Sequence, residues 1–229
     1  MHVKEFSPTD ILGPLNEVEQ KNAPDILFLL GDEELLRRGV RVSIVGSRKA
    51  SKEGLRRAAR FSKLLVSRGI YVVSGLAEGI DTAAHVAAVE EGGRTIAVIG
   101  TPLDQAYPAK NQILQDEIAK SHLVVSQFPI GSSVQKRNFP ARNRTMALLT
   151  DATVIVEAKE DSGSLQQAWE AFRLGRPLFI MESILADKTL TWPAKVMQYG
   201  AQLLSDETVE GFFDYLRSGN SGDEQTFPF

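Results

Sequence analysis

Arg41–Lys49, RVSIVGSRK, is the stretch that decides the fold of this chain. Its first half is a short apolar run rich in β-branched residues, which is typical of a buried parallel strand. The run stops at Gly46-Ser47-Arg48, and a segment with helical spacing follows from about Ser51. A buried strand that breaks at a glycine and continues into a helix predicts a doubly wound α/β domain. In that fold, ligands bind outside the carboxyl ends of the strands.

The turn after this strand has the composition of an anion site. Gly46 lets the backbone approach a ligand closely, and Ser47 can cap the helix or donate to a phosphate oxygen. The helix N-terminus adds partial positive charge, and Arg48 and Lys49 add full charges. These residues favour an anion, and a phosphate in particular. An ordinary strand-to-helix turn with a solvated arginine explains the three letters GSR equally well.

The composition bounds the class of protein. At 229 residues the chain fits one domain with a small appendage, and a hydrophobic fraction of 43% is enough for a packed core. It has no run of eighteen apolar residues, so we expect no membrane span. The N-terminal stretch MHVKEFSPTD lacks the apolar centre of a signal peptide. Zero cysteines exclude disulfides, thiolate metal sites and thiol catalysis, and together these features favour a cytoplasmic protein.

Charge is distributed unevenly along the chain. The net charge is −3, yet Arg37–Arg68 holds eleven basic residues and one acid, and Lys136–Arg144 holds four basic residues and no acid. By contrast, Ser205–Phe229 holds six acids and one arginine. Local fields rather than the total steer a polyanion. We nevertheless favour a plain solvated helix face for four of these cations: Arg56, Arg57, Arg60 and Lys63.

The order of predicted elements indicates an α/β fold with a mostly parallel, doubly wound sheet and helices on both faces. Strands are predicted at 42–45, 70–73, 95–99, 123–126, 153–156, 178–181 and 201–204. Helices are predicted at 51–68, 82–91, 111–120, 142–150, 162–174, 193–199 and 206–217. We expect 1–40 to be an irregular or partly helical lead-in that packs on the main domain, 41–205 to be that domain, and 206–229 to be an acidic helix and polar tail, the tail from Ser218.

Small or polar residues follow several of the predicted strands. They are Gly46-Ser47, Ser74-Gly75, Gly100-Thr101 and, after Glu157, Ser162-Gly163-Ser164. Parallel strands share a direction, so we expect all of these ends at one edge of the sheet, where they would form several anion-binding corners.

A second basic stretch, KRNFPARNR at 136–144, is expected to reach that edge from the long loop 127–140 and the helix after it. Arg137, Arg142 and Arg144 can make bidentate contacts to phosphate, and Asn143 can bond a phosphate or a base edge. Phe139 either stacks on a base or plugs the core. Lys110 and Asn111 place a further cation at another helix entrance.

Five motifs resemble the DNA-processing protein A (DprA/Smf) family in order and spacing, over about residues 24–181. The motifs are Val45-Gly46-Ser47-Arg48; SGLAEGID at 74–81 with His85; Tyr107-Pro108 with Asn111; FPARNR at 139–144; and Val156-Glu157-Ala158 with Ser162-Gly163-Ser164-Leu165.

The resemblance implies an extended Rossmann-like domain that binds single-stranded DNA. It also implies a homodimer without established catalytic activity, which loads the RecA recombinase onto incoming DNA during natural transformation. We therefore expect DNA recombination as the role, and no catalytic residue, metal, cofactor or membrane contact. The residues predicted to bind DNA are Gly46, Ser47, Arg48, Lys49, Ser74, Gly75, Lys110, Asn111, Arg137, Phe139, Arg142, Asn143, Arg144, Ser162, Gly163 and Ser164.

The sequence also departs from the family pattern. We expect neither the helical domain that often precedes the Rossmann-like unit nor the winged-helix domain that often follows it. Met181-Glu182 replaces the usual Pro-Gly, and Trp192–Lys195 stands where Gly-x-Asn is common. These changes spare the DNA-binding residues but leave the dimer surface and the RecA contact open. The apolar strand predicted at 178–181 still favours a dimer.

Two other functions fit the same fold. Phosphoribohydrolases of the wider superfamily release a base from nucleoside monophosphates with a Gly-Gly-x-Gly-Thr-x-x-Glu signature. The matching stretch here ends in Gln167, which cannot act as a base. Of the titratable candidates, we expect Asp81 to cap the following helix and His85 to pack or hydrogen-bond within it, and Glu157 is the third.

A sensor of a free or cyclic nucleotide would use the same edge of the sheet. The extra cations at Lys110 and 137–144 favour a polymer with several phosphates instead. The sequence argues against a dinucleotide dehydrogenase, because GSRKASKEG lacks the G-x-G-x-x-G spacing. The three scattered histidines show no spacing of metal ligands.

Overall fold

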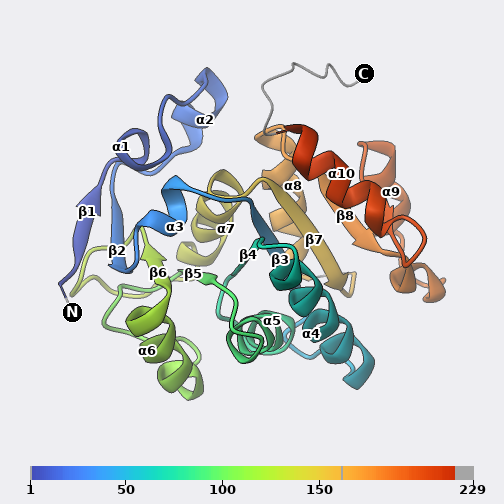
Figure 1. Cartoon of the computed structure of the whole chain (residues 1–229), viewed down its shortest axis with the longest axis horizontal. Coiled ribbons are helices and arrows are strands. Elements are labelled where there is room, and N and C mark those ends of the chain that lie inside the picture. Colours follow the sequence, from blue (N-terminus) through green and yellow to red (C-terminus); the bar gives the residue numbers. More distant parts are fainter. Residues whose placement is uncertain (1, 161, 220–229) are drawn as a thin grey trace.

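The computed structural model describes residues 2–160 and 162–219. Within these ranges one sheet lies between two layers of helices (Figure 1). The strands are β1 (Lys4–Phe6), β2 (Leu27–Gly31), β3 (Arg41–Gly46), β4 (Tyr71–Ser74), β5 (Thr95–Ile99), β6 (Leu123–Ser126), β7 (Ala152–Glu157), β8 (Leu178–Met181) and β9 (Gln202–Leu204). The helices are α1 (Pro8–Leu12), α2 (Glu17–Asn22), α3 (Glu34–Arg37), α4 (Lys52–Ser67), α5 (Ile80–Glu90), α6 (Gln112–Ser121), α7 (Asn138–Leu148), α8 (Ser164–Arg173), α9 (Trp192–Gln198) and α10 (Val209–Gly219), with 3₁₀ turns η1 (Ala109–Asn111) and η2 (Glu182–Ala186).

The sheet has the strand order β1-β2-β6-β5-β4-β3-β7-β8-β9. All neighbours from β6 to β9 are parallel, whereas β1 and β2 are antiparallel additions at one edge. The predicted α/β class with a mostly parallel sheet is confirmed.

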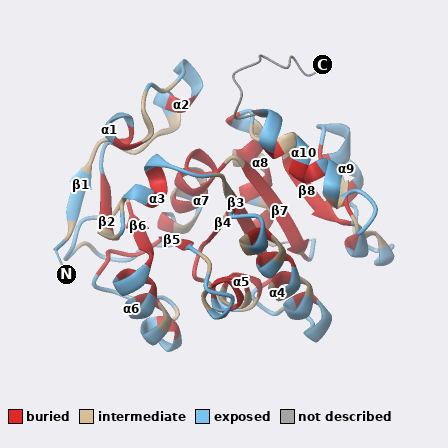
Figure 2. Cartoon of the chain, in the orientation of Figure 1, coloured by how far each residue is buried: buried red, intermediate tan, exposed pale blue. Residues whose placement is uncertain are grey.

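The central strands are buried on both faces because their apolar side chains alternate between two cores. On β3, Val42 and Ile44 belong to the core that α4, α5 and α10 cover. Val45 belongs to the core on the other face, which includes side chains of α7, α8 and α9. Figure 2 shows these strands buried along their length and the outer helix faces exposed. Burial on both faces explains why the strands read as continuous apolar runs.

The strand order reverses between β3 and β7. From β3 the chain adds β4, β5 and β6 on one side, and from β7 it adds β8 and β9 on the other. The carboxyl ends of β3 and β7 therefore form a topological switch point, which is where open α/β sheets bind their ligands. Gly46 and Glu157 pair at these ends, so the motifs that follow the two strands start side by side.

The segment 1–40 is more ordered than predicted. We expected an irregular or partly helical lead-in, but β1 and β2 are strands that extend the sheet beyond β6. β2 ends at Gly31, where an added Cβ would lie only 2.1 Å from the backbone O of His122. The sequence of β2 is a continuous apolar run, and periodicity alone cannot tell such a strand from a buried helical turn.

Helix α7 begins at Asn138, about one turn before its predicted start at Arg142. It therefore contains Pro140, which a first turn accepts because its missing N–H has no intrahelical acceptor there. The predicted loop at 127–140 is correspondingly shorter. As a result, Phe139 and Arg142 lie three positions apart on one helix and share a side of it.

Two expectations about the C-terminal region also change. β8 lies between β7 and β9, so the apolar strand from which we predicted a homodimer is not a free edge. Helix α10 continues through Ser218, where we expected the tail to begin. The rest of that predicted tail, beyond residue 219, lies outside the described residues. No helix in the described ranges has both the length and the apolar character needed to cross a membrane.

Candidate functional site

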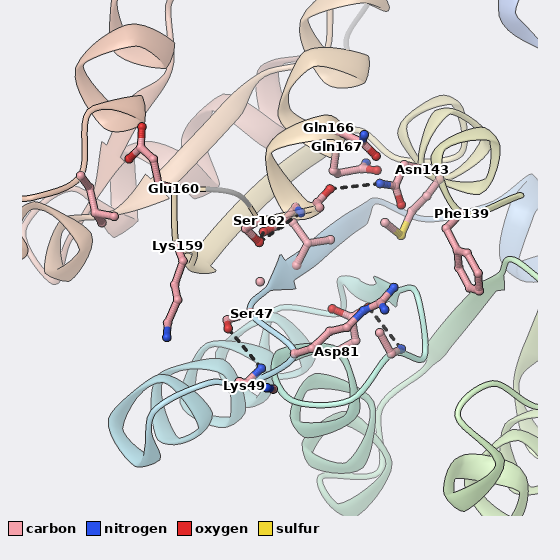
Figure 3. Close-up of a pocket in the computed structure, with 18 of the residues that line it drawn as sticks. Ser47, Lys49, Asp81, Phe139, Asn143, Lys159, Glu160, Ser162, Gln166 and Gln167 are labelled. Atoms are coloured by element: carbon pink, nitrogen blue, oxygen red, sulfur yellow. Dashed lines mark hydrogen bonds between the residues drawn. The ribbon is translucent and has the colours of Figure 1, made fainter. Parts of the chain in front are cut away.

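A cavity of about 820 Å³ opens at the switch point between β3 and β7 (Figure 3). Its walls come from the turn after β3, the first half of α7, the loop from Lys159 into α8, and the loop at 187–190. Three exposed cations that line it, Arg48, Lys49 and Lys159, are called the cation rim below.

Two exposed carboxylates also line this cavity, and both are hydrogen-bonded. Glu160 accepts from the backbone N of Thr191 at 2.9 Å and from its hydroxyl, and these bonds lower the pKa of Glu160. Asp187 accepts from the backbone N and the hydroxyl of Thr189. Hydrogen bonds from neutral donors leave both carboxylates negatively charged, so the three cations of the cation rim outnumber the exposed carboxylates by one.

The turn after β3 is fixed by its own backbone rather than by capping the next helix. The backbone N of Ser47 donates to Glu157 O at 2.7 Å. The Ser47 hydroxyl accepts from Lys49 N at 3.2 Å, whereas the residue that caps α4 is Ser51. Of the two roles considered for Ser47, capping the helix is wrong, because α4 begins after Ser51, where it was predicted to begin.

The N-terminus of α4 is not an open anion site either. Glu157 accepts from Ser51 N at 2.8 Å and from the Ser51 hydroxyl, and Arg57 Nη2 lies 3.4 Å from its Oε2. An added Cβ on Gly54 would lie 2.3 Å from that same carboxylate. A carboxylate of the chain thus occupies the position in which we expected a phosphate, and Glu157 has a structural role.

Phe139 forms a bridge between the main cavity and a smaller hollow. The Arg48 guanidinium lies 5.6 Å from the centre of its ring, and the Tyr107 ring lies 5.2 Å away at 49°. The smaller hollow, about 80 Å³, is lined by Gly75, Gly100 and Tyr107 among others. Four residues line both hollows: Arg48, Ala77, Phe139 and Arg142. The result is a partly exposed aromatic row beside a cation, an arrangement that stacks planar ligands.

Arg142 lies in the floor of the cavity and is 5% exposed. Its Nη1 donates to the backbone O of Val98 at 2.9 Å. Burial lowers the pKa of Arg142, and the buried Asp81 carboxyl opposes that change. Burial raises the pKa of Asp81, and the positive charge of Arg142 opposes that rise. We predicted that Arg142 binds a phosphate, but its guanidinium is buried and hydrogen-bonded to the backbone O of Val98.

Asp81 does not cap helix α5 as predicted. The residue before that helix is Gly79, and Asp81 accepts instead from Ala77 N at 3.3 Å, in the loop that precedes the helix (Figure 3). His85 bonds across to the sheet rather than within its helix, because its Nδ1 lies 2.7 Å from Thr95 Oγ1. Burial lowers the pKa of His85 to about 3.

Several of the predicted DNA-binding residues lie outside the main cavity. Ser74 is fully buried, and its hydroxyl donates to Ile44 O at 2.6 Å. Asn111 is buried and donates to Leu76 O and to Thr82 Oγ1, both at 2.9 Å. Ser74 thus links β4 to β3, Asn111 links η1 to the loop before α5 and to that helix, and neither side chain is presented to a ligand.

The remaining predicted cations lie around the cavity rather than in it. Lys110 forms an ion pair with Glu78, and Arg144 Nε lies 3.3 Å from Glu170 Oε2. Arg137 is exposed just before α7. Arg48 and Arg142 line the same cavity, and Lys110 is not among its lining residues.

Four polar residues that were not among the predicted ligands also line the cavity: Lys159, Gln166, Asp187 and Thr189. Gln167, which we considered only as a replacement for a catalytic glutamate, lines it too. Lys159 comes two residues after β7, so the rule that ligands bind beyond strand ends could have selected it. Gln167 is three positions after Ser164 and so shares its helix face. Among the described residues there is no group of three or more metal-ligating side chains.

The basic face of α4 is exposed at Arg56, Arg60 and Lys63, as we predicted for a solvated helix face, and these cations also pair with acids of the chain. Arg56 pairs with Glu53, and Lys63 with Glu91. Arg60 and Arg68 pair with Asp206 and Glu210 of the acidic C-terminal segment.

Comparison with known proteins gives a consistent family. The family model described as DNA recombination-mediator protein A matches residues 6–214. The DNA processing protein DprA of Streptococcus pneumoniae is 42% identical over 211 residues, which cover 92% of this chain and 74% of that protein. An X-ray structure of DNA processing protein A from the same organism superposes with a TM-score of 0.76 at 39% identity, over 88% of this chain and 70% of that one. A structure that describes the single-stranded DNA binding mode of DNA processing protein A from Helicobacter pylori superposes with a TM-score of 0.78 at 26% identity, over 95% of this chain and 96% of that one.

Proposed function

The chain belongs to the family of DNA recombination-mediator protein A, as the five sequence motifs predicted, and from this premise we propose that it binds single-stranded DNA with little sequence preference. The observation that carries the proposal is the cavity at the switch point, where the cation rim stands next to the partly exposed ring of Phe139.

In this proposal the cation rim binds phosphates and the aromatic row binds bases. Arg48, Lys49 and Lys159 offer charge-assisted contacts to successive phosphates. Bases that leave the cavity stack on Phe139 and Tyr107, each stack contributing about 1–3 kcal/mol. Neither kind of contact depends on which base is present, so the binding is tolerant of sequence.

We assign the other predicted residues to supporting positions. Gly46, Gly163 and the hydroxyls of Ser162 and Ser164 line the wall at which the DNA backbone comes close. Asn143 lines the cavity, whereas Gly75, Ser74, Asn111 and Arg142 shape its floor and the adjacent loops. Lys110, Arg137 and Arg144 would extend the path of a longer strand. All of them fall in the segment 41–205, which we propose as the DNA-binding unit.

The proposed activity is binding rather than catalysis. Gln167 takes the place in which a phosphoribohydrolase would use a glutamate, and an amide can neither accept a proton nor stabilise an oxocarbenium charge as a carboxylate does. Release of a free base from nucleoside monophosphates by the purified protein would overturn this assignment.

Fluorescence anisotropy with a labelled oligothymidine tests the proposal. We expect Arg48→Ala to weaken binding about tenfold, because it removes one charge-assisted contact to a phosphate. The matched control is Arg56→Ala, which removes the same charge from α4, where Arg56 pairs with Glu53. Equal losses in the two variants would contradict the site. Complete displacement of the oligonucleotide by a micromolar mononucleotide would favour a nucleotide sensor instead.

We further propose that the bound strand is passed to the RecA recombinase and that the protein acts in the cytoplasm as a homodimer. The family description as a recombination mediator supports a recombinase partner. The rate of RecA filament assembly on a coated strand, with and without this protein, tests the partner. Sedimentation equilibrium tests the dimer.

A further inference from the structure

The smaller hollow beside Phe139 has an acidic side chain in its lining. Glu78 lines it together with Tyr107 and Phe139. The Glu78 carboxylate accepts a hydrogen bond from the Lys110 ammonium, and the two groups form an ion pair. The side chains of Glu78 and Lys110 are 53% and 58% exposed, so a ligand can reach both of them. An accessible acid and an accessible cation therefore lie together beside the aromatic row.

The two backbone segments that carry this pair are fixed by buried contacts. Asn111, which follows Lys110, is 5% exposed, and its Nδ2 donates to Leu76 O at 2.9 Å. On the Glu78 side, a Cβ on Gly79 would lie 2.3 Å from a backbone O of the turn after β3, so this loop packs directly on that turn. The backbone of Lys110 therefore keeps its place beside the hollow whether or not the ion pair is formed.

The ion pair is weak enough to exchange its acid for another anion. Exposed ion pairs contribute little free energy, because water solvates both charges and the two side chains lose freedom when they pair. A phosphate accepts charge-assisted hydrogen bonds from an ammonium as a carboxylate does. A DNA phosphate at this hollow can thus replace Glu78 at Lys110. The displaced carboxylate keeps its charge, so the phosphate binds in competition with it.

A free anion and an anchored strand meet this competition differently. A mononucleotide must displace Glu78 from bulk solution. A strand whose other phosphates already lie on the cation rim presents its next phosphate intramolecularly, at an effective concentration that is roughly millimolar. Arg48 and Phe139 line both hollows, so one strand can occupy the two together. The ion pair therefore disfavours single anions and favours a polymer.

We propose that Glu78 is a specificity-determining residue: it occupies Lys110 in the free protein and releases it to a phosphate of a strand that is anchored in the main cavity. The inference rests on the proposed function, because it states which ligand of that site gains the contact to Lys110. Glu78 belongs to the motif at 74–81, although it was not among the predicted DNA-binding residues.

A double-mutant cycle tests the exchange. Labelled oligothymidine is titrated with the wild type, Glu78→Gln, Lys110→Gln and the double variant, and anisotropy reports binding. We expect Glu78→Gln to bind the strand about threefold more tightly than the wild type, because a neutral amide competes less well than a carboxylate for Lys110. In the Lys110→Gln background the same substitution should have little effect, because it has no ammonium to release.

Glu91→Gln is the matched control for this cycle. It makes the same change of charge and frees Lys63 of α4, and it should leave binding unchanged. Equal tightening by Glu78→Gln with and without Lys110 would show that Glu78 only repels the strand, and would overturn the inference. Unchanged binding by Glu78→Gln, or equal tightening by Glu91→Gln, would overturn it as well. Failure of the wild type to bind oligothymidine at low salt would instead overturn the proposed function itself.

Competition by a single anion tests the requirement for anchoring. Unlabelled oligothymidine and thymidine monophosphate each compete with the labelled strand, on the wild type and on Glu78→Gln. We expect the ratio of their affinities to rise about threefold in favour of the strand in the variant, because only the strand extends from the cation rim to Lys110. A mononucleotide that gains as much affinity as the strand would show that Glu78 does not distinguish the two, and would contradict the proposal.

Discussion

At the scale of single residues, the floor of the cavity requires glycine at position 75, because any side chain there would clash with Arg142. A Cβ on Gly75 would lie 1.6 Å from Arg142 Nη1 and 2.4 Å from its Cζ. Arg142 could not move away without breaking its bond to Val98 O and leaving the buried Asp81 carboxyl without its nearby cation. The two segments that contribute Gly75 and Arg142 are far apart in sequence, and this contact fixes them together.

We therefore expect Gly75→Ala to lower the free energy of unfolding by about 3 kcal/mol, through overpacking and the disturbed buried charges. Urea denaturation measures the change. The control is Gly211→Ala on α10, where nothing lies within 4 Å of the added Cβ. That variant should be neutral or more stable by up to about 1 kcal/mol, because alanine favours a helix. A Gly75→Ala protein as stable as the wild type would show that Arg142 can leave the floor freely.

His85 gives a prediction about pH. Burial lowers its pKa from 6.5 to about 3 in the folded protein. Below pH 6.5 the unfolded chain therefore binds a proton that the folded chain does not, so stability is full above that pH and falls as the pH decreases toward 3. The slope reaches at most about 1.4 kcal/mol per pH unit.

Urea denaturation of the wild type and of His85→Gln, at one pH above 6.5 and one about a unit below it, isolates this contribution. We expect the wild type to lose about 1 kcal/mol more than the variant over that interval. Burial also lowers the pKa of His122, which acts in the same direction, so His122→Gln serves as the second comparison. Parallel profiles of wild type and His85→Gln would mean that His85 is protonated within the fold.

At the scale of elements, helix α4 is tied to strand β7 by one carboxylate. Glu157 accepts from the N-cap residue Ser51 and faces Arg57, so it stabilises the first turn of the helix. We expect Glu157→Ala to cost about 1–2 kcal/mol of stability and not to weaken the binding of oligonucleotides. Thermal unfolding and anisotropy on the same preparation measure both effects.

Glu53→Ala is the matched control for this change, because it removes an acid from the first turn of α4 that is exposed and pairs only with Arg56. It should cost less than about 0.5 kcal/mol. A loss of DNA binding in Glu157→Ala without a loss of stability would restore a direct role for Glu157 in the site.

The sequence predicted elements well where one physical signal acted alone. Strands buried on both faces showed as apolar runs bounded by glycine or polar residues, and those at 95–99, 123–126 and 178–181 have the predicted bounds. Helix α7 was placed about one turn late because Pro140 was interpreted as a loop residue, although a first turn tolerates proline. β2 was missed because a short apolar run has the same pattern in a strand and in a buried helical turn.

The site was predictable at the level of segments and less so at the level of side chains. Because parallel strands end at one edge, the motifs after β3 and β7 had to meet, and they do. Whether a polar side chain faces a ligand depends on partners elsewhere in the chain, such as Glu78 for Lys110 or Ile44 O for Ser74. Spacing along the sequence carries no information on those contacts.

At the scale of the whole molecule, the net charge of −3 hides a separation of charge. Asp206 and Glu210 of the C-terminal segment pair with Arg60 and Arg68, so the acidic end of the chain neutralises the basic face of α4. The cation rim has no such covering segment among the described residues. We therefore expect a polyanion to bind at the cavity rather than along the basic face of α4.

Salt dependence separates these two surfaces. For about 3–5 phosphate contacts to a single strand, the logarithm of the binding constant should fall with the logarithm of salt concentration with a slope of about −2 to −3.5. Lys159→Gln, which removes one cation of the rim, should make the slope shallower by about 0.7, and should do so for oligothymidine and oligoadenosine alike. Lys63→Gln removes a cation of α4 that already pairs with Glu91, and it should leave the slope unchanged. If Lys63→Gln changed the slope and Lys159→Gln did not, the strand would lie on α4, and the cavity at the switch point would not be the DNA site.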